Sequence, residues 1–287
     1  MKKILITGAT GFVGRKVVEQ CLQYDFDITI CGLNEIKLHE MEKEFGVKAI
    51  AFDIKKSHNN WSKYTGHPDI LIHLAWEGLT DYKDLIHIET QPFTHYQFLK
   101  SMLQGGLKSL TVAGTCSEYG MQEGCLSEDM PTLPNNSYGV GKDTLRKFLE
   151  VLGNEYSFSL KWLRYFYMYG QRQSPTALFP QLKASIKRQD KIFNMSGGEQ
   201  LRDFLPVETI AEYTIKAAIQ DTINGIINIC SGKPISVKEF VEQRIIELQS
   251  EIKLNLGYYP YPDFEPMSFW GDNTRLQNLL NLKKNNY

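Results

Sequence analysis

The chain has 287 residues, and its 32 basic and 33 acidic side chains leave a formal net charge of −1. Interspersed charges near neutrality exclude the basic surface that nucleic acids or anionic membranes require. Five scattered cysteines without a CxxC pair indicate free thiols, and the histidines lack metal-ligand spacing, so we expect no metal site. No run of about eighteen apolar residues occurs, so we expect neither a membrane span nor a signal peptide, and a cytoplasmic location.

The first predicted elements surround a glycine-rich turn. KKILI at residues 2–6 is typical of a buried parallel strand, and residues 12–22 have the spacing of an amphipathic helix. Between them, TGATGFVG allows a tight turn, close approach of the backbone to a pyrophosphate, and close helix packing. A plain strand-to-helix turn is the alternative. The context favours a dinucleotide site, with phosphates at the helix start and contacts from Gly8, Thr10, Gly11, Phe12, Val13 and Gly14.

Apolar runs and helical patterns then alternate along the chain. Strands are predicted at residues 27–31, 48–54, 69–75, 109–115 and 158–165, and helices at 35–45, 86–104 and 138–153. This alternation predicts an α/β fold with a doubly wound parallel sheet of the Rossmann type. Further helices are predicted at 176–188, 207–219 and 236–249, before a loop at 257–266. We expect a dinucleotide-binding domain over 1–165 and a smaller substrate lobe over 166–287, with some segments returning to the sheet domain.

The candidate catalytic residues follow a predicted strand. Ligands in such sheets bind at the carboxyl ends of the strands, where Thr115 stands, and Tyr138 and Lys142 are one turn apart on the next helix. A phenol with a pKa of about 10 is a poor base, and a neighbouring ammonium lowers that pKa. The trio suits proton transfer to or from a carbonyl or carbinol oxygen while hydride moves at its carbon. Without the glycine turn and Thr115, an ordinary surface helix would be the better interpretation of the pair.

Together these residues resemble the extended short-chain dehydrogenase/reductase family, specifically the NAD-dependent epimerase/dehydratase group that acts on nucleotide sugars. HLA at 73–75, LRYFYMYGQRQ at 163–173, EQLRDFLPVETIAE at 199–212 and NICSGKPISVKEFVE at 228–242 extend the resemblance over nearly the whole chain. It implies catalysis by Thr115, Tyr138 and Lys142 on a nucleoside diphosphate sugar. Further cofactor contacts would be Asp53, Ile54, Leu74, Ala75, Lys142 and Tyr165. Substrate contacts would be Trp76, Thr115, Ser117, Glu118, Tyr138, Tyr167 and Arg202, the last at the diphosphate.

Two positions depart from the group's pattern. The group usually has an asparagine where Tyr167 stands, so a polar contact to the substrate is either lost or replaced by stacking. The arginine that usually precedes the C-terminal helix is not evident in residues 263–276, where Arg275 comes late.

The end of the second predicted strand bears on the choice of dinucleotide. An NAD site commonly carries an acid there to bind the ribose 2′-hydroxyl, but this chain has Gly32 and no acid before Glu35. We therefore expect NADP, with NAD as the alternative, and a 2′-phosphate within reach of Arg15, Asn34 or Lys37. Asp53 either contacts the adenine or caps a strand end.

The residues after Thr115 bear on the reaction. Dehydratases of the group place an acid one or two positions after the catalytic threonine, whereas this chain has Cys116 and Ser117 there. Glu118 comes one residue late, which turns its side chain to the other face. Dehydration is thus disfavoured, and an inert thiol is a better interpretation of Cys116 than a nucleophile.

SEYG at 117–120 resembles nucleotide-sugar 4-ketoreductases. We expect NADPH-dependent reduction at C4 of a nucleoside-diphosphate 4-keto-6-deoxysugar, with Tyr138 as proton donor and Lys142 lowering its pKa. The alternatives are an NAD-dependent nucleotide-sugar 4-epimerase and a non-catalytic dinucleotide-binding protein. The resemblance suggests a role in making cell-surface polysaccharide precursors. The apolar surface of residues 93–103 predicts either a helix-to-helix homodimer contact or a well-packed core helix.

Overall fold

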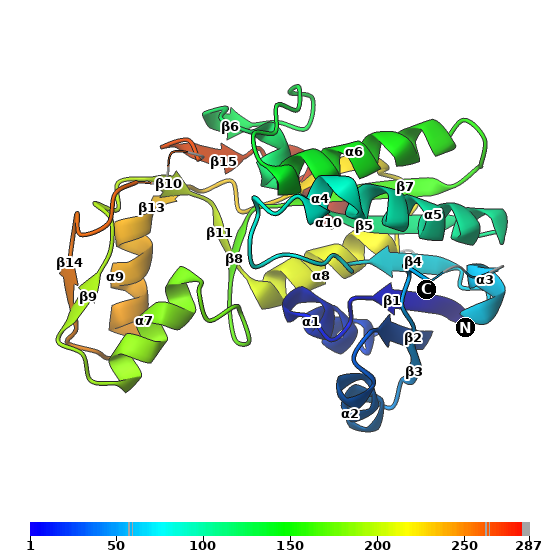
Figure 1. Ribbon diagram of the computed structural model, residues 1–287, viewed down its shortest axis with the longest axis horizontal. Coiled ribbons are helices and arrows are strands. Elements are labelled where there is room, and N and C mark those ends of the chain that lie inside the picture. The colour runs from blue at the N-terminus through cyan, green and yellow to red at the C-terminus, as the bar shows by residue number, and fades with distance from the viewer. Residues whose placement is uncertain (57, 59, 262, 264, 283–287) are drawn as a thin grey trace.

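The computed structural model describes residues 1–56, 58, 60–261, 263 and 265–282. A seven-stranded sheet in the order β12-β7-β5-β4-β1-β2-β3 forms its centre (Figure 1). All neighbouring pairs in this sheet are parallel, which confirms the predicted doubly wound α/β fold. The strands are β1 Lys2–Thr7, β2 Phe26–Gly32, β3 Lys48–Ala51, β4 Ile70–His73, β5 Ser109–Thr115, β7 Ser159–Tyr165 and β12 Gly225–Ile229.

The order of these strands determines where a ligand can bind. From β1 the chain adds strands on one side as far as β3, then crosses back to place β4 on the other side of β1. The register pairs Thr7 of β1 with His73 of β4, so both strands end at the same edge. A crevice opens where two such neighbouring strands lead their connections in opposite directions, and it lies at the carboxyl ends.

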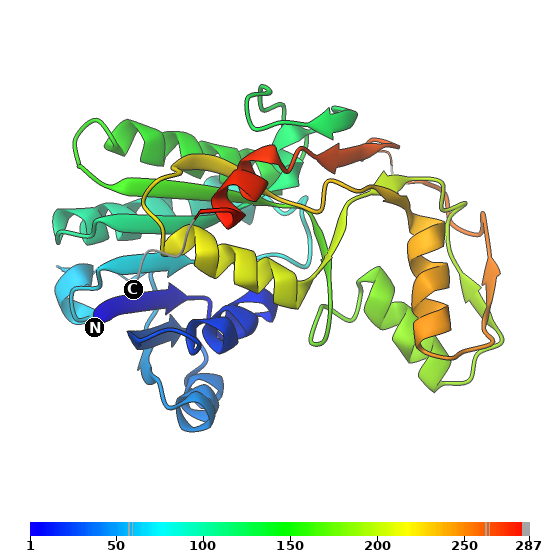
Figure 2. The same ribbon diagram turned by 180° about the vertical axis from the view of Figure 1, so that it is seen from behind.

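Helices cover both faces of the sheet (Figures 1 and 2). One face carries α1 Phe12–Cys21, α2 Glu35–Phe45, α8 Val207–Ala218 and α10 Thr274–Leu280. The other carries α3 Trp61–Tyr64, α4 Ile86–Glu89, α5 Gln91–Gln104 and α6 Ser137–Leu152. Each face has its own buried core, with Val17 and Ile215 in the first and Phe98 and Leu145 in the second. The sheet is thus apolar on both faces, as its continuous hydrophobic strands predict.

The single helix predicted over residues 86–104 is wrong in one respect. The chain forms α4 and α5 there, with Thr90 between them at φ −122° and ψ −49°. Pro92 lies in the first turn of α5, where its missing N–H costs no hydrogen bond. Because proline is not tolerated in a helix interior, Pro92 begins a new helix instead of continuing the old one.

The residues after β7 contribute to two parts of the molecule. A smaller lobe contains two helices, α7 Leu178–Lys187 and α9 Val237–Glu247. It also contains two strand pairs. In one, β9 Ile192–Asn194 pairs with β14 Lys253–Asn255, and in the other, β10 Leu201–Arg202 pairs with β13 Ile235–Ser236. Two more pairs lie between this lobe and the sheet: β8 Tyr167–Tyr169 with β11 Phe204–Pro206, and β6 Gly124–Leu126 with β15 Phe269–Gly271. Meanwhile β12 joins the main sheet, and α8 and α10 pack on it. Over the described residues, every helix is too short or too polar to cross a membrane.

Candidate active site

A cavity of about 920 Å³ lies at the carboxyl ends of the central strands. The glycine turn after β1 lines one end, and Thr115, Tyr138 and Lys142 line the middle. Tyr167, Met168 and Glu265 come from the region after β7. The site residues expected from the sequence line this cavity, except Glu118, Arg202 and two of the candidates for a 2′-phosphate, Arg15 and Lys37. The structure therefore brings the cofactor and catalytic candidates to the crevice that the strand order predicts.

The glycine turn fits a dinucleotide pyrophosphate. Gly8 has a φ of +67°, and a Cβ there would lie 2.7 Å from the backbone nitrogen of Ala75. A Cβ on Gly14 would overlap the carbonyl oxygen of Gly8. No side chain among the described residues caps α1 at Gly11, so the N–H groups of its first turn are left for a ligand. Uncapped N–H groups and the positive end of the helix dipole suit a phosphate.

The residues expected to bind a 2′-phosphate are engaged elsewhere. Arg15 pairs with Glu44 and with Glu19, the latter at 3.5 Å, and its guanidinium lies 4.7 Å from the ring centroid of Phe45. The Asn34 side chain accepts a hydrogen bond from the Lys37 backbone N–H at 2.9 Å and so caps α2. Arg15 and Lys37 are absent from the described lining of the cavity. These contacts do not support the NADP preference, which stays a prediction.

Thr115, Tyr138 and Lys142 converge on one wall of the cavity. Thr115 ends β5, its hydroxyl donates to Ser117 Oγ at 3.2 Å, and its side chain is close enough to the Tyr138 phenol to lower the pKa of that phenol. Lys142 donates from Nζ to the carbonyl oxygen of Ala113 at 2.8 Å. The same Nζ lies 4.0 Å from the ring centroid of Trp76 and 6.0 Å from that of Tyr138. One strand end and one turn of α6 thus present two hydroxyl groups and an ammonium to the same space.

The pKa of the phenol differs from our expectation. Burial raises the pKa of Tyr138 well above 10, Tyr82 raises it further, and the side chain of Thr115 opposes both. Burial also lowers the pKa of Lys142 to about 7. The expected lowering of the phenol pKa by Lys142 is therefore wrong for this structure, because the buried ammonium is directed at Ala113 and Trp76. A phenol that stays protonated at neutral pH is suited to give up a proton to an oxygen that is becoming negative.

The expectation that Glu118 contacts substrate is also wrong. Its side chain has no exposed surface and hydrogen-bonds the backbone at the end of β5. One carboxylate oxygen accepts from the Thr115 backbone N–H at 2.9 Å and from the Trp162 indole at 2.8 Å. The other accepts from Arg164 Nε at 2.8 Å. The turn at Cys116–Tyr119 directs Glu118 away from the cavity, so it positions Thr115 without reaching a ligand.

Arg202 does not face the cavity as expected. Its guanidinium donates to Glu265 at 3.1 Å and to the carbonyl oxygen of Leu201 at 2.9 Å, and it lies 4.6 Å from the ring centroid of Phe269. Burial leaves 3% of this residue exposed. Glu265, its ion-pair partner, is the member of the pair that lines the cavity. In this structure the arginine meets a carboxylate of the chain itself where a diphosphate was expected.

Sequence reasoning missed a buried histidine pair beneath the cavity. Thr7 Oγ1 accepts from the backbone N–H groups of residues 74 and 75, so its hydroxyl donates to His73 Nδ1 at 2.9 Å. His73 Nε2 then donates to His95 Nδ1 at 2.6 Å, and His95 Nε2 donates to Gln91 Oε1 at 2.8 Å. Burial lowers the pKa of His73 to about 3 and that of His95 well below its usual value, so both rings are neutral. Gln91 Nε2 is buried without a hydrogen-bond partner among the described residues, which leaves a donor at the cavity wall.

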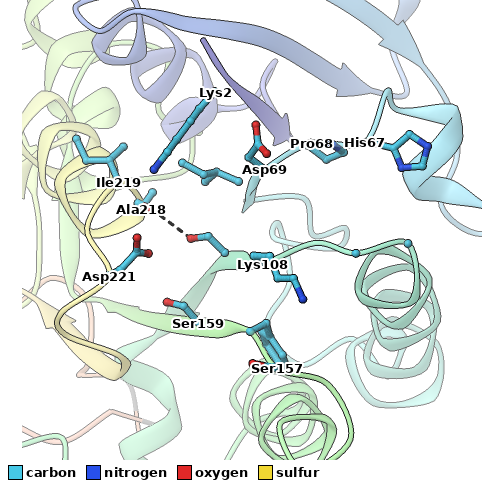
Figure 3. A pocket seen from close by; sticks show the side chains of 15 residues that line it. Lys2, His67, Pro68, Asp69, Lys108, Ser157, Ser159, Ala218, Ile219 and Asp221 are labelled. Atoms are coloured by element: carbon cyan, nitrogen blue, oxygen red, sulfur yellow. Dashed lines mark hydrogen bonds between the residues drawn. The ribbon is translucent and has the colours of Figure 1, made fainter. Parts of the chain in front are cut away.

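A second cavity, of about 580 Å³, lies at the amino ends of β1, β4, β5 and β7 (Figure 3). None of the expected site residues lines it. Next to it, the fully buried Lys161 donates to Ser109 Oγ at 3.0 Å and pairs with Asp221 at 3.5 Å. The positive charge of Lys161 is thus balanced by a carboxylate of the same chain. Across the described residues, no three His, Cys, Asp or Glu side chains are grouped to hold a metal ion.

A family model described as the NAD dependent epimerase/dehydratase family matches residues 4–230. The chain belongs to this family. Its glycine turn, Thr115, Tyr138 and Lys142 all lie within the matched residues. The resemblance that the sequence motifs indicated is confirmed.

Named relatives differ in their reactions. The chain is 30% identical over 270 residues to a dTDP-6-deoxy-L-talose 4-dehydrogenase (NAD(+)) of Aggregatibacter actinomycetemcomitans, covering 93% of this chain and 98% of the relative. It is 26% identical to a UDP-glucuronate 4-epimerase of Thermodesulfobacterium geofontis, covering 96% and 90%. Among solved structures, the UDP-N-acetylglucosamine 4-epimerase of Methanobrevibacter ruminantium M1 superposes with a TM-score of 0.86 at 22% identity, covering 97% and 91%. The last of these likenesses supports the fold alone.

Proposed function

We propose that this protein is a nicotinamide-dinucleotide-dependent reductase of a nucleoside-diphosphate 4-keto-6-deoxysugar, acting at C4. The observation that carries the proposal is the meeting of Thr115, a protonated Tyr138 and Lys142 in a cavity whose other end is the glycine turn. The relative at 30% identity is named for oxidation at C4 of a 6-deoxysugar, which is the same reaction in the opposite direction.

The chain's own residues supply the proton and the orientation. When bound, the nicotinamide supplies the hydride. The hydroxyl groups of Thr115 and Tyr138 hydrogen-bond the keto oxygen, and Tyr138 donates its proton as negative charge grows on that oxygen. The raised pKa keeps this proton in place at neutral pH until it is needed. Lys142 lines the same cavity, and when protonated its positive charge stabilises the negative charge that develops on the keto oxygen.

The part of the cavity lined by Cys116, Phe166 and Glu265, which we call the substrate half, has walls that favour a 6-deoxysugar. Cys116 and Phe166 line this part, and burial raises the pKa of the Cys116 thiol to about 12, so it stays neutral and apolar. A C6 methyl group fits such a surface better than a hydroxyl or carboxylate does. Glu265 lines the same half and pairs with Arg202 at 3.1 Å, so this arginine is already engaged and does not favour the carboxylate of a uronic acid.

For the cofactor we propose NADH over NADPH. Arg15 is already paired with Glu19 and Glu44, so a 2′-phosphate would have to displace those carboxylates. The name of the 30% identical relative also specifies NAD(+). The ratio of kcat/KM for NADH to that for NADPH tests this choice, and a ratio below one would restore the expectation from the sequence.

A nucleotide-sugar 4-epimerase is the alternative function, because the relative at 26% identity carries that name. The two are separated by incubating the purified protein with dTDP-, GDP- and UDP-linked 4-keto-6-deoxysugars and reduced dinucleotide. A reductase consumes the dinucleotide in proportion to product. Release of bound NAD on denaturation, together with epimerised sugar and no net consumption of dinucleotide, would overturn the reductase in favour of the epimerase.

We also propose a homodimer formed through the outer faces of α5 and α6. Phe93, Phe148 and Val151 project from these helices with exposed fractions of 60%, 39% and 64%. An apolar surface of this kind on two adjacent helices suits a self-complementary contact. Sedimentation velocity of the purified chain tests it, and a monomer at all concentrations would contradict it.

A further inference from the structure

Tyr82 is an aromatic residue of the active site that motif reasoning did not single out. It lies in the connection between β4 and α4, and its ring stacks on that of Tyr138 with centroids 4.8 Å apart and planes at 17°. Trp76 and His87 approach the same Tyr138 ring edge-on, at 6.3 Å and 5.3 Å between centroids. The catalytic phenol is therefore held by aromatic contacts, one on its face and two at its edges.

Hydrogen bonds fix the position of Tyr82. Its carbonyl oxygen accepts from the Tyr138 backbone N–H at 3.0 Å, at the start of α6. Trp76 Nε1 donates to His87 Nδ1 at 2.9 Å, which leaves the proton of that ring on Nε2. His87 Nε2 then donates to the carbonyl oxygen of Asp81 at 3.0 Å. The residue before Tyr82 and Tyr82 itself are thus tied to the helix that carries Tyr138.

Tyr82 is part of the cavity wall and is 45% exposed. Burial raises the pKa of its phenol, and the nearby Cys116 and Glu265 raise it further. Tyr138 lines the same cavity and its ring is stacked on that of Tyr82, so both phenols border the same region. That region is the substrate half of the cavity, between β5 and Glu265.

We propose that Tyr82 is a specificity-determining residue whose hydroxyl hydrogen-bonds a sugar hydroxyl on a carbon next to the reacting carbon. Two stacked phenols whose ring centroids lie 4.8 Å apart in one cavity wall suit two neighbouring oxygens of one pyranose ring. Tyr138 meets the reacting oxygen and Tyr82 meets its neighbour. The identity of the sugar rests on the proposed function, whereas the contact itself requires only that a nucleotide sugar binds.

The test compares nucleotide sugars with the nucleoside diphosphates that lack the sugar. Tyr82→Phe keeps the stacked ring and removes the hydroxyl, so it separates the contact from the support of Tyr138. We expect this variant to bind the dTDP-6-deoxyhexose about 3- to 10-fold more weakly than the wild type, the effect of one hydrogen bond, and to bind dTDP equally well. The same titrations with UDP- and GDP-linked sugars, and with UDP and GDP alone, are included because the nucleotide base of the substrate is not known.

Kinetics provide the second readout. In Tyr82→Phe we expect KM to rise and kcat to stay nearly unchanged. Tyr82→Leu should also lower kcat, because Tyr138 then loses the ring stacked on its face. Equal affinity of Tyr82→Phe and wild type for the sugar, or an equal loss for dTDP, would overturn the proposal. Wild-type protein that binds no nucleotide sugar more tightly than its nucleoside diphosphate would also overturn it. A sugar-specific loss without turnover of any 4-ketosugar would instead sustain the contact and contradict the proposed function.

Discussion

Two lysines are buried at opposite ends of the same sheet, and their surroundings differ. Lys161, at the amino ends, is fully buried but has Asp221 and the Ser109 hydroxyl as partners. Lys142, at the carboxyl ends, is 2% exposed and meets a carbonyl oxygen and an indole ring. No carboxylate among the described residues pairs with it. A buried charge with matched partners is explained by the fold, whereas one held without a counter-ion beside a cavity indicates a functional site.

The largest expected effect comes from removing the proposed proton donor at the carboxyl ends of the strands. Tyr138→Phe should lower turnover by about 1,000-fold, within the range typical of a lost general acid, and leave dinucleotide binding nearly unchanged. Steady-state rates and fluorescence titration with the dinucleotide measure the two quantities. Tyr165→Phe is the matched control, because Tyr165 lines the same cavity but its hydroxyl meets Thr214 in the core. Undiminished turnover in Tyr138→Phe would remove the phenol from the mechanism.

Replacing each buried lysine by methionine tests the comparison directly. Lys142→Met should lower turnover by about 100-fold or more through loss of the positive charge in the cavity wall. Lys161→Met should leave turnover within about twofold, because the residue is remote from the proposed active-site cavity. Similar losses of turnover in both variants would show that the two ends of the sheet do not differ in function.

The same pair separates function from stability. The pKa of Lys142 in the folded protein, about 7, is below its ordinary value of 10.5. Between these pH values the unfolded chain binds more protons than the folded one, so the stability of the wild type rises with pH. Lys142→Met lacks this dependence. Compared with the wild type, the variant should have a free energy of unfolding that is higher by on the order of 2 kcal/mol below pH 7. This difference should vanish towards pH 10.5.

Denaturant unfolding at several pH values measures that gain. Lys161→Met should gain less, since Asp221 already offsets part of the cost of burying Lys161. A Lys142→Met variant that is less stable than the wild type below pH 7 would show that the lysine is structural after all.

The smallest expected effect on chemistry comes from Glu118. Glu118→Gln leaves Arg164 buried without its counter-ion and should cost about 3 kcal/mol of unfolding free energy, while KM stays nearly unchanged. Glu265→Gln is the matched variant, because Glu265 lines the cavity. It should change KM with a smaller loss of stability, since Glu265 is partly exposed and Arg202 also donates to two backbone carbonyl oxygens. A large rise of KM in Glu118→Gln, without loss of stability, would return that carboxylate to the substrate site.

Local signals in the sequence located most of the fold and the centre of the site. The strand at Ser109–Thr115 and the helix at Glu35–Phe45 have the predicted bounds. The glycine turn and the Tyr138–Lys142 spacing depend on neighbours within one turn, so they could be placed without tertiary information. Pro92 carried the signal for the break between α4 and α5, which the apolar pattern across it concealed.

Errors arose where a side chain's partner is distant in sequence. Glu118 is bound by Arg164, 46 residues later, and Arg202 by Glu265, 63 residues later. Neither spacing carries a motif, so the competition of these partners with a ligand could not be anticipated. Tyr82 lies in a connecting loop without periodicity, and its place over Tyr138 follows from hydrogen bonds to α6. Tertiary ion pairs and loop anchoring, in contrast to local propensity, decide these positions.

The anchoring of Glu118 limits how this scaffold can diverge. Eliminating water from a sugar needs an acid that reaches the ring, and the side chains at 116 and 117 are the ones directed there. The existing carboxylate cannot be recruited, because it holds Arg164 and the end of β5 in place. A lineage moving from this chain towards a lyase must therefore acquire a new acid next to the threonine and retain the old one in the core.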